Sequence, residues 1–165
     1  VQAFQTHIDE LINYDYDVAT YTGTMRNIAK ARIQGVEAGV SREMGAWSMS
    51  VNATLQQPKS QSGATNDKLL ARRPKAQLKA DIDRSIGRGS VGASLQAVGK
   101  RYEDASNTQR LSGYSTVDLR AQYPLAKHLS VAVKLGNVLD KHYETALGYN
   151  QPGRHGLISL TYSPQ

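Results

Sequence analysis

Cysteine is absent from all 165 residues, which excludes disulfide bonds and thiolate-bound metals. Long apolar runs are absent too, and nothing approaches the roughly 18 apolar residues that predict a transmembrane helix. Dense positive charge is equally scarce. The 20 lysines and arginines are scattered, apart from the pair at 72–73, so a net charge of +6 does not indicate nucleic-acid binding. The opening residues lack the basic-then-apolar order of a signal peptide and already read as a strand, as in a fragment.

Apolar and polar residues alternate with a period of two along most of the chain. In residues 47–55, for example, Trp47, Met49 and Val51 alternate with serine and asparagine. Successive side chains of a strand point to opposite faces, so each such segment has one apolar and one polar face. The mean hydropathy of -0.50 is low because the two faces cancel. The alternation predicts eight strands, at 2–12, 24–42, 46–58, 70–86, 89–103, 114–125, 128–140 and 154–163.

The alternation changes phase inside the second of these strands. Residues 30, 32 and 34 are polar, yet Val36, Ala38 and Val40 continue the same parity as apolar residues, and Gly35 lies at the change. An extra residue or a bend restores the phase of a strand, and glycine is common at such places. The sequence therefore predicts a bulge or bend at Gly35.

The connections between the predicted strands alternate strictly between long and short. Long connections follow residues 12, 58, 103 and 140, whereas the joins near residues 44, 88 and 127 take only a few residues. Outer-membrane barrels have this asymmetry, with short periplasmic turns and long outer loops. Several strands also reach the length of about nine to eleven residues that spans a bilayer at a tilt. We therefore predict an all-β, antiparallel transmembrane barrel; the alternative is a soluble antiparallel sandwich with one wet face.

The polar faces of these strands carry charges that would be costly against lipid. In a barrel they must point into a hydrated lumen or toward whatever fills it. The charged residues concerned are Lys79, Asp81, Asp83, Asp118, Arg120 and Lys134. Aromatic residues lie near strand ends, as in the girdles at membrane interfaces: Trp47, Tyr102, Tyr123, Tyr143 and Tyr162.

No motif in the chain predicts catalysis, a metal or a cofactor. The G-x-G-x-x-G pattern at 87–92 is followed by an alternating strand rather than a helix, which favours a tight hairpin turn over nucleotide binding. The four histidines are scattered without metal-ligand spacing, and no nucleophile elbow surrounds any serine. We therefore expect neither an enzyme nor a cofactor-binding protein.

Four segments resemble the C-terminal part of TonB-dependent outer-membrane receptors, across essentially the whole chain. They are YTGTMRNIAKARIQGVEAGV, LLARRPKAQLKADID, YSTVDLRAQYPLAKHLSVAVKLGNVLDKHYETALGYNQPGR and the terminal strand. ARIQGVEA and NVLDKHYE are specific to this superfamily, whereas LLARRPKAQ and YETALGYNQPGR point to its cobalamin (vitamin B-twelve) branch. The resemblance implies that residues 1–165 are about the last eight strands of a plugged barrel of the type with roughly 22 strands, located in the bacterial outer membrane.

The same resemblance implies energised import. A cobalamin-type ligand would bind the outer loops, a plug domain would fill the lumen, and TonB would act through an N-terminal segment that has no counterpart here. A ferric-siderophore receptor of the same architecture is the alternative, and eight strands could also close a small binding module.

By resemblance, Arg72 and Tyr149 match positions where cobalamin receptors contact ligand. A flat ligand fringed with amides suits an aromatic face beside a guanidinium. Arg72 could equally be a rim charge that caps a strand. Ser106 departs from the pattern, because an aromatic ligand contact is expected there, and the terminal LTYSPQ lacks the final aromatic residue typical of these barrels.

Overall fold

The computed structural model describes residues 1–17 and 22–164, without the side chains of Leu11 and of residues 13–29. The described chain consists of strands and one short 3-10 turn, η1 (Gly63–Thr65). Its long strands are β1 (Gln2–Asp17), β2 (Thr22–Met44), β3 (Trp47–Ser60), β4 (Ala76–Ile86), β5 (Gly89–Val98), β8 (Tyr114–Ala126), β9 (Leu129–Gly136) and β12 (His155–Tyr162). Two small hairpins complete the set, β6 (Arg101–Tyr102) with β7 (Arg110–Leu111) and β10 (Glu144–Ala146) with β11 (Tyr149–Asn150).

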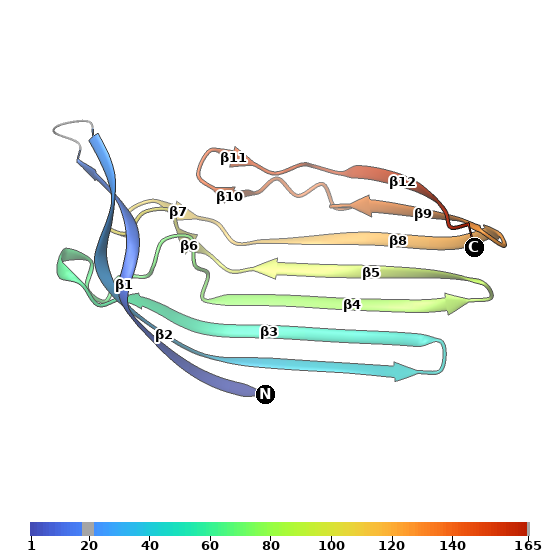
Figure 1. Ribbon diagram of the computed structural model, residues 1–165, viewed down its shortest axis with the longest axis horizontal. Helices are drawn as coiled ribbons and strands as arrows, with labels where there is room; N and C mark the ends of the chain where they lie inside the picture. The colour runs from blue at the N-terminus through green and yellow to red at the C-terminus, as the bar shows by residue number, and fades with distance from the viewer. Residues whose placement is uncertain (18–21, 165) are drawn as a thin grey trace.

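The long strands form one antiparallel sheet in the order β1-β2-β3-β4-β5-β8-β9-β12 (Figure 1). Each strand therefore pairs with its neighbours in the chain, once the small hairpins are set aside. The predicted all-β antiparallel architecture of eight strands is confirmed. The sheet is open, because in the described residues β1 pairs with β2 alone and β12 with β9 alone. The alternative of a small barrel closed by these eight strands is therefore wrong.

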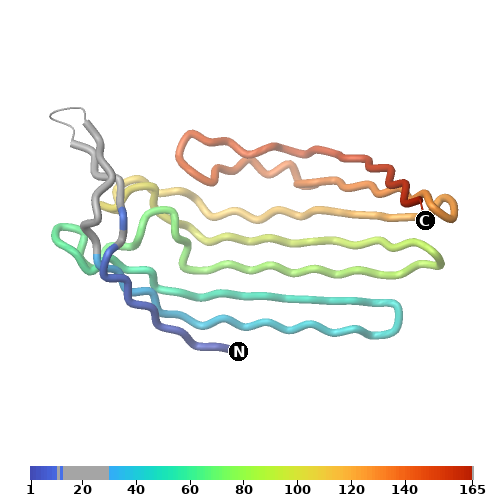
Figure 2. Tube along the Cα trace, in the orientation of Figure 1, coloured from blue at the N-terminus to red at the C-terminus, as the bar shows by residue number. Residues whose placement is uncertain are grey.

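Short turns lie at one end of the sheet and long loops at the other (Figure 2). Two residues each join β2 to β3, β4 to β5 and β8 to β9. Gly45 and Gly87 begin two of these turns in the left-handed region, with φ of 58° and 57°, which glycine adopts without steric cost. The G-x-G-x-x-G pattern is thus a hairpin between β4 and β5, as predicted. The small hairpins and η1 belong to the long loops.

Several strand ends differ from the predicted ones, because loop residues pair elsewhere. β4 begins at Ala76 rather than at residue 70, since residues 67–70 fold back along the end of β3. The Ser60 amide donates to the Lys68 carbonyl at 2.9 Å and the Leu70 amide to the Pro58 carbonyl at 2.9 Å. β5 and β9 end early, at the bases of their loops. Conversely, β1 and β2 pair as far as Asp17 and Thr22, well into the connection predicted after residue 12.

The predicted bulge at Gly35 is wrong. β2 keeps its register with β1 and β3 there, and the register shifts of the β1–β2 pair lie between Ile8 and Ile12. The phase changes because apolar residues switch faces: Ala31 and Ile33 pack with Leu70 on the polar side of the sheet. Gly35 is needed for close approach, since a Cβ there would meet the Leu55 carbonyl and lie 2.9 Å from the Phe4 ring.

The register separates an apolar face from a polar face along the rest of the sheet. Val51, Ala80, Leu95 and Val117 pair in a row across four strands. The apolar face is covered by no second layer, and large apolar side chains on it stay exposed, such as Val40, Leu119, Tyr123, Ile158 and Leu160. A soluble sandwich would bury this face, so the structure does not support that alternative.

The boundary of the apolar face carries a charge close to an aromatic ring. Arg84 pairs with Trp47 beside the β2–β3 turn, and its guanidinium lies 5.0 Å from the centre of the indole ring. Such a stem lies on apolar surface while its charged end stays at the aqueous boundary. No helix in the described part of the chain is long and apolar enough to cross a membrane.

Candidate functional site

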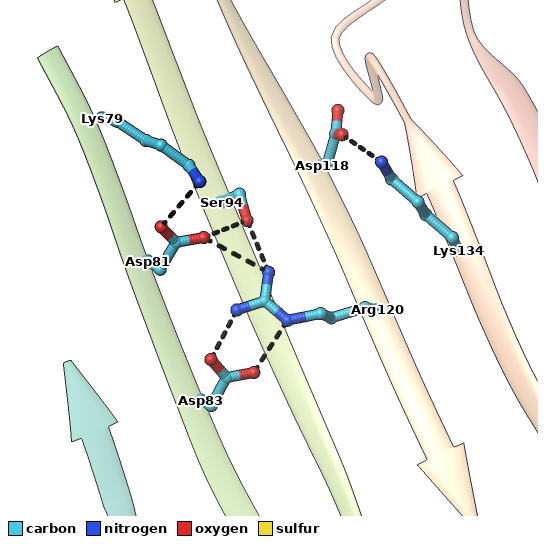
Figure 3. A network of polar contacts seen from close by, with 7 residues as sticks. All are labelled: Lys79, Asp81, Asp83, Ser94, Asp118, Arg120 and Lys134. Carbon is cyan, nitrogen blue, oxygen red and sulfur yellow. Dashed lines mark hydrogen bonds and ion pairs between the residues drawn. The ribbon is translucent and has the colours of Figure 1, made fainter. Parts of the chain in front are cut away.

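The polar face carries a network of ion pairs centred on Arg120 (Figure 3). The Arg120 guanidinium donates two parallel hydrogen bonds to the Asp83 carboxylate, from Nε to Oδ1 at 2.8 Å and from Nη2 to Oδ2 at 2.5 Å. Its remaining nitrogen, Nη1, donates to the Ser94 hydroxyl at 2.5 Å and lies 3.6 Å from Asp81 Oδ1. Two parallel bonds fix a guanidinium geometrically as well as energetically, so Arg120 ties β4, β5 and β8 together on this face.

Further pairs extend the network along and across the strands. Ser94 donates to Asp81 at 2.6 Å, and Lys79 lies 3.6 Å from the same carboxylate. On the next strands, Lys134 Nζ lies 3.0 Å from Asp118 Oδ2. The six charged residues predicted for polar faces therefore do share one face and neutralise one another. This is the chemistry of a hydrated wall rather than of a reactive site.

Three long loops meet at the other end of the sheet. They are residues 61–75 before β4, residues 99–113 with the β6–β7 hairpin, and residues 137–154 with the β10–β11 hairpin. The 99–113 loop lies between the other two and bonds to both. Its Asn107 bonds to both backbone groups of Leu69, at 2.8 and 2.9 Å, and Arg101 donates to the carbonyls of Glu144 and Thr145, at 2.6 and 3.0 Å.

Arg72 lies in the 61–75 loop with an unusual backbone conformation. Its φ of 58° is left-handed, and the other described non-glycine residues with positive φ are asparagines or aspartates, which tolerate it better. The Arg72 amide donates to the Tyr102 carbonyl at 2.7 Å, and its guanidinium forms an ion pair with Glu103, with Nε 2.7 Å from Oε1. Arg72 is therefore held by the neighbouring loop, and its side chain is not simply a cap on β4.

Tyr149 lies in β11 and is 70% exposed. The Leu147 amide, two residues before it, donates to Glu103 Oε2 at 3.1 Å. The hydrogen bond that Arg72 donates to Glu103 raises the pKa of the Arg72 guanidinium against the effect of burial, and Tyr149 adds a smaller electrostatic contribution of the same sign. Arg72 and Tyr149 therefore belong to two loops that both bond to Glu103, whereas Ser106 is exposed near the tip of the 99–113 loop.

Glu103 and Arg101 are the residues of this cluster that the sequence did not reveal. Partial burial would raise the pKa of Glu103, but hydrogen bonds from Arg72 and the Leu147 amide, and the nearby charges, outweigh it and hold that pKa below its usual value. Arg101 is buried, and its guanidinium lies 5.6 Å from the centre of the Tyr114 ring, which stacks on Tyr143 at 4.1 Å. The hydrogen-bond partners of both side chains lie more than 30 positions away in the sequence, beyond any local pattern.

A buried asparagine fastens the base of the 137–154 loop. The Asn137 amide donates to Asp118 Oδ1 at 2.9 Å, and its side chain bonds to the backbone of Lys141, at 2.9 Å in both directions, and to the Pro152 carbonyl at 3.2 Å. One side chain therefore ties both limbs of the loop to the end of β9. This explains why β9 ends at Gly136, immediately before the segment NVLDKHYE.

Replacing Asn137 by alanine is expected to destabilise the folded protein by about 2–3 kcal/mol. The Lys141 amide and two carbonyls would lose their partner in a buried place. The matched control is Asn150→Ala in exposed β11, which we expect to change stability by less than about 0.5 kcal/mol. Urea unfolding of the full-length protein in lipid vesicles measures both. Equal stabilities of the two variants would contradict the anchoring role of Asn137.

No group of three or more metal-ligating side chains that could hold an ion is found among the described residues. The features that stand out are instead an exposed apolar face, a polar face of paired charges, and a joined set of loops at one end.

A family model described as "TonB dependent receptor-like, beta-barrel" matches residues 1–138. Among solved structures, the chain is similar to the siderophore receptor PiuA from Acinetobacter baumannii, with 19% identity and a TM-score of 0.80 over 97% of this chain and 25% of that one. It is similar to the ferripyoverdine receptor of the outer membrane of Pseudomonas aeruginosa, with 23% identity and a TM-score of 0.73 over 97% and 24%. The copper transporter OprC gives 17% identity and a TM-score of 0.79 over 98% and 28%.

These similarities concern the fold, since every identity is below 25%. The chain spans about a quarter of the length of the structures that it matches.

Proposed function

Because the chain belongs to the TonB-dependent receptor-like β-barrel family, we propose that it is the loop-bearing wall of a receptor that captures a ligand outside the cell for import. Members of this family are outer-membrane transport receptors rather than enzymes. The chain is therefore part of an outer-membrane protein. The open sheet, with its exposed apolar face and paired charges on the reverse, is the form that such a wall takes.

The observation that carries this proposal is the joined cluster of the three long loops. Arg72 and Tyr149 belong to two of these loops, which are joined through Glu103, and they are the two residues for which the sequence resemblance implies ligand contact. An exposed aromatic face beside a fixed guanidinium can stack on a planar ligand and donate to its oxygens. The proposed role of Arg72 is therefore to donate hydrogen bonds to ligand oxygens, and that of Tyr149 is to stack on the ligand plane.

A ferric siderophore or a similar metal chelate is the ligand class that we favour. The three loops contain nine lysines and arginines against five aspartates and glutamates, a net charge of +4. Such a surface attracts anionic chelates more than uncharged corrinoids. Two of the similar structures described above are named as receptors for siderophore ligands and one as a copper transporter. Cobalamin is the second candidate, and the segments LLARRPKAQ and YETALGYNQPGR support it.

The proposal needs partners that lie outside these residues. Import would be energised by TonB through an N-terminal segment, and a plug domain would face the charged wall around Arg120. The eight strands would be joined by others to close a barrel of about 22 strands. None of these partners is part of the 165 residues.

Competition in whole-cell uptake separates the two ligand classes. Cells that carry the full-length receptor would take up a labelled ferric siderophore, and unlabelled ferric chelates would compete while cyanocobalamin would not. The control is the same strain without the receptor. If cyanocobalamin competed and the ferric chelates did not, cobalamin rather than a ferric siderophore would be the ligand.

Replacing Tyr149 by alanine is expected to weaken ligand binding about ten- to thirtyfold, because truncating an exposed aromatic anchor removes its stacking area. The matched control is Tyr123→Ala, an equally drastic change on the apolar face near the β8–β9 turn, far from the loops. Equilibrium binding to the purified full-length receptor measures both. Unchanged affinity in the Tyr149 variant would remove this residue from the proposed site.

A further inference from the structure

The side chain of Glu103 is shared between two loops. One carboxylate oxygen, Oε1, accepts from Arg72 in the 61–75 loop, and the other, Oε2, accepts from the Leu147 amide in the 137–154 loop. The carboxylate is well shielded, with 13% of its side chain exposed, whereas the Arg72 side chain is 61% exposed. Glu103 therefore lies inside the loop cluster. Of its two partners, Arg72 has an exposed side chain, and Leu147 lies two residues before the exposed Tyr149.

Two other side chains of the 99–113 loop also bond to the flanking loops, and they differ from Glu103. Asn107 fastens the loop to Leu69, and Arg101 fastens it to the carbonyls at 144–145. Each of these hydrogen-bonding side chains reaches one flanking loop. Glu103 reaches both, and it contacts Arg72 itself and a residue two positions before Tyr149.

The backbone of Arg72 indicates that its position is imposed rather than preferred. The left-handed region is sterically unfavourable for an arginine, and such conformations persist where the surrounding contacts hold them in place. Two contacts from the 99–113 loop do this, the Tyr102 carbonyl on the amide and Glu103 on the guanidinium. An unrestrained Arg72 would sample other orientations of its guanidinium.

We propose that Glu103 is a positioning residue, which holds the guanidinium of Arg72 and the β10–β11 hairpin with Tyr149 at a fixed separation before ligand arrives. The inference rests on the proposed function, and it assigns Glu103 no contact with the ligand. Ordering two groups in advance removes part of the entropic cost of binding, so the expected effect of losing Glu103 is on affinity.

The first test needs no ligand. Spin labels at Arg73→Cys and Asn150→Cys report the distance between the two flanking loops, and both native side chains are exposed. In the full-length receptor we expect a narrow distance distribution by pulsed electron resonance. It should broaden in Glu103→Ala and, to a smaller extent, in Glu103→Gln. The matched control is Asp104→Asn, because the hydrogen-bond partners of the Asp104 carboxylate, Thr108 and Gln109, lie in its own loop.

The second test asks whether the role is exerted through Tyr149. Glu103→Ala should weaken binding of the labelled ferric siderophore roughly tenfold, with an unchanged melting temperature. In the Tyr149→Ala background the same change should weaken binding clearly less than tenfold, because one of the two groups that Glu103 positions is gone. A merely structural role would give equal losses in both backgrounds.

The outcomes are distinguishable from failure of the proposed function. An unchanged distance distribution in Glu103→Ala, or full additivity with Tyr149→Ala, would overturn the positioning role. A receptor that binds neither ferric chelate nor corrinoid, yet shows the broadening, would overturn the proposed function and support the coupling of the loops.

Discussion

An arginine in place of Leu95 is expected to destabilise the folded receptor by about 2–4 kcal/mol, the cost of this side chain on the lipid face of a barrel near the bilayer midplane. Leu95 pairs with Ala80 on one side and Val117 on the other, and Ala80 pairs with Val51 in turn. This row crosses the apolar face, with Leu95 six residues from the first residue of β5 and three from the last. The guanidinium could not reach either aqueous boundary as easily as Arg84 does.

The neighbouring residue supplies the control for this prediction. Gln96 is exposed on the polar face of the same strand, paired with Lys79 and Thr116. Gln96→Arg introduces the same positive charge one residue after Leu95, but on the polar face. We expect it to lower the free energy of unfolding by less than about 1 kcal/mol. Urea unfolding in lipid vesicles compares the two variants. Equal losses, or a larger loss for Gln96→Arg, would show that the two faces have been assigned wrongly.

Replacing Arg120 by glutamine is expected to destabilise the receptor by about 1–3 kcal/mol. The change removes the two parallel bonds to Asp83 and the contact with Asp81, and it leaves both carboxylates on β4 without their shared cation. Because the Arg120 side chain is 36% exposed, water recovers part of the loss, which keeps the effect below that of a fully buried pair.

Two comparisons make the Arg120 prediction specific. Adding Asp83→Asn to Arg120→Gln should restore part of the stability, since it removes the unpaired charge. Lys134→Gln breaks a single ion pair with Asp118. Because the Lys134 side chain is 55% exposed, this change should cost less than about 1 kcal/mol. If Lys134→Gln were as harmful as Arg120→Gln, the network would not be centred on Arg120.

The sheet could be predicted because its information is local. A period of two recurs in most of the long strands, and it assigns residues such as Val131 and Ala132 to opposite faces without any knowledge of partners. The short turns follow from Gly45 and Gly87, which supply the left-handed backbone that two-residue hairpins need. Consecutive pairing then fixes the order of the strands.

The loop cluster could not be predicted in this way. Glu103 is joined to Arg72 across 31 positions and to Leu147 across 44, and no periodicity links such residues. The apolar cluster of Ala31, Ile33 and Leu70 could not be foreseen for the same reason, because its third member comes from a loop that folds back, and the bulge predicted at Gly35 was therefore wrong.

The most direct test of the barrel wall is a nitroxide scan along β9 in the full-length receptor, in an outer-membrane preparation. Labels are placed one at a time at Val131, Ala132, Val133 and Lys134, and their accessibility to oxygen and to a water-soluble nickel complex is measured. We expect oxygen access to peak at Val131 and Val133, which face away from the charged wall, and to fall at Ala132 and Lys134. Equal exposure of Val131 and Ala132 to the aqueous reagent would contradict the account.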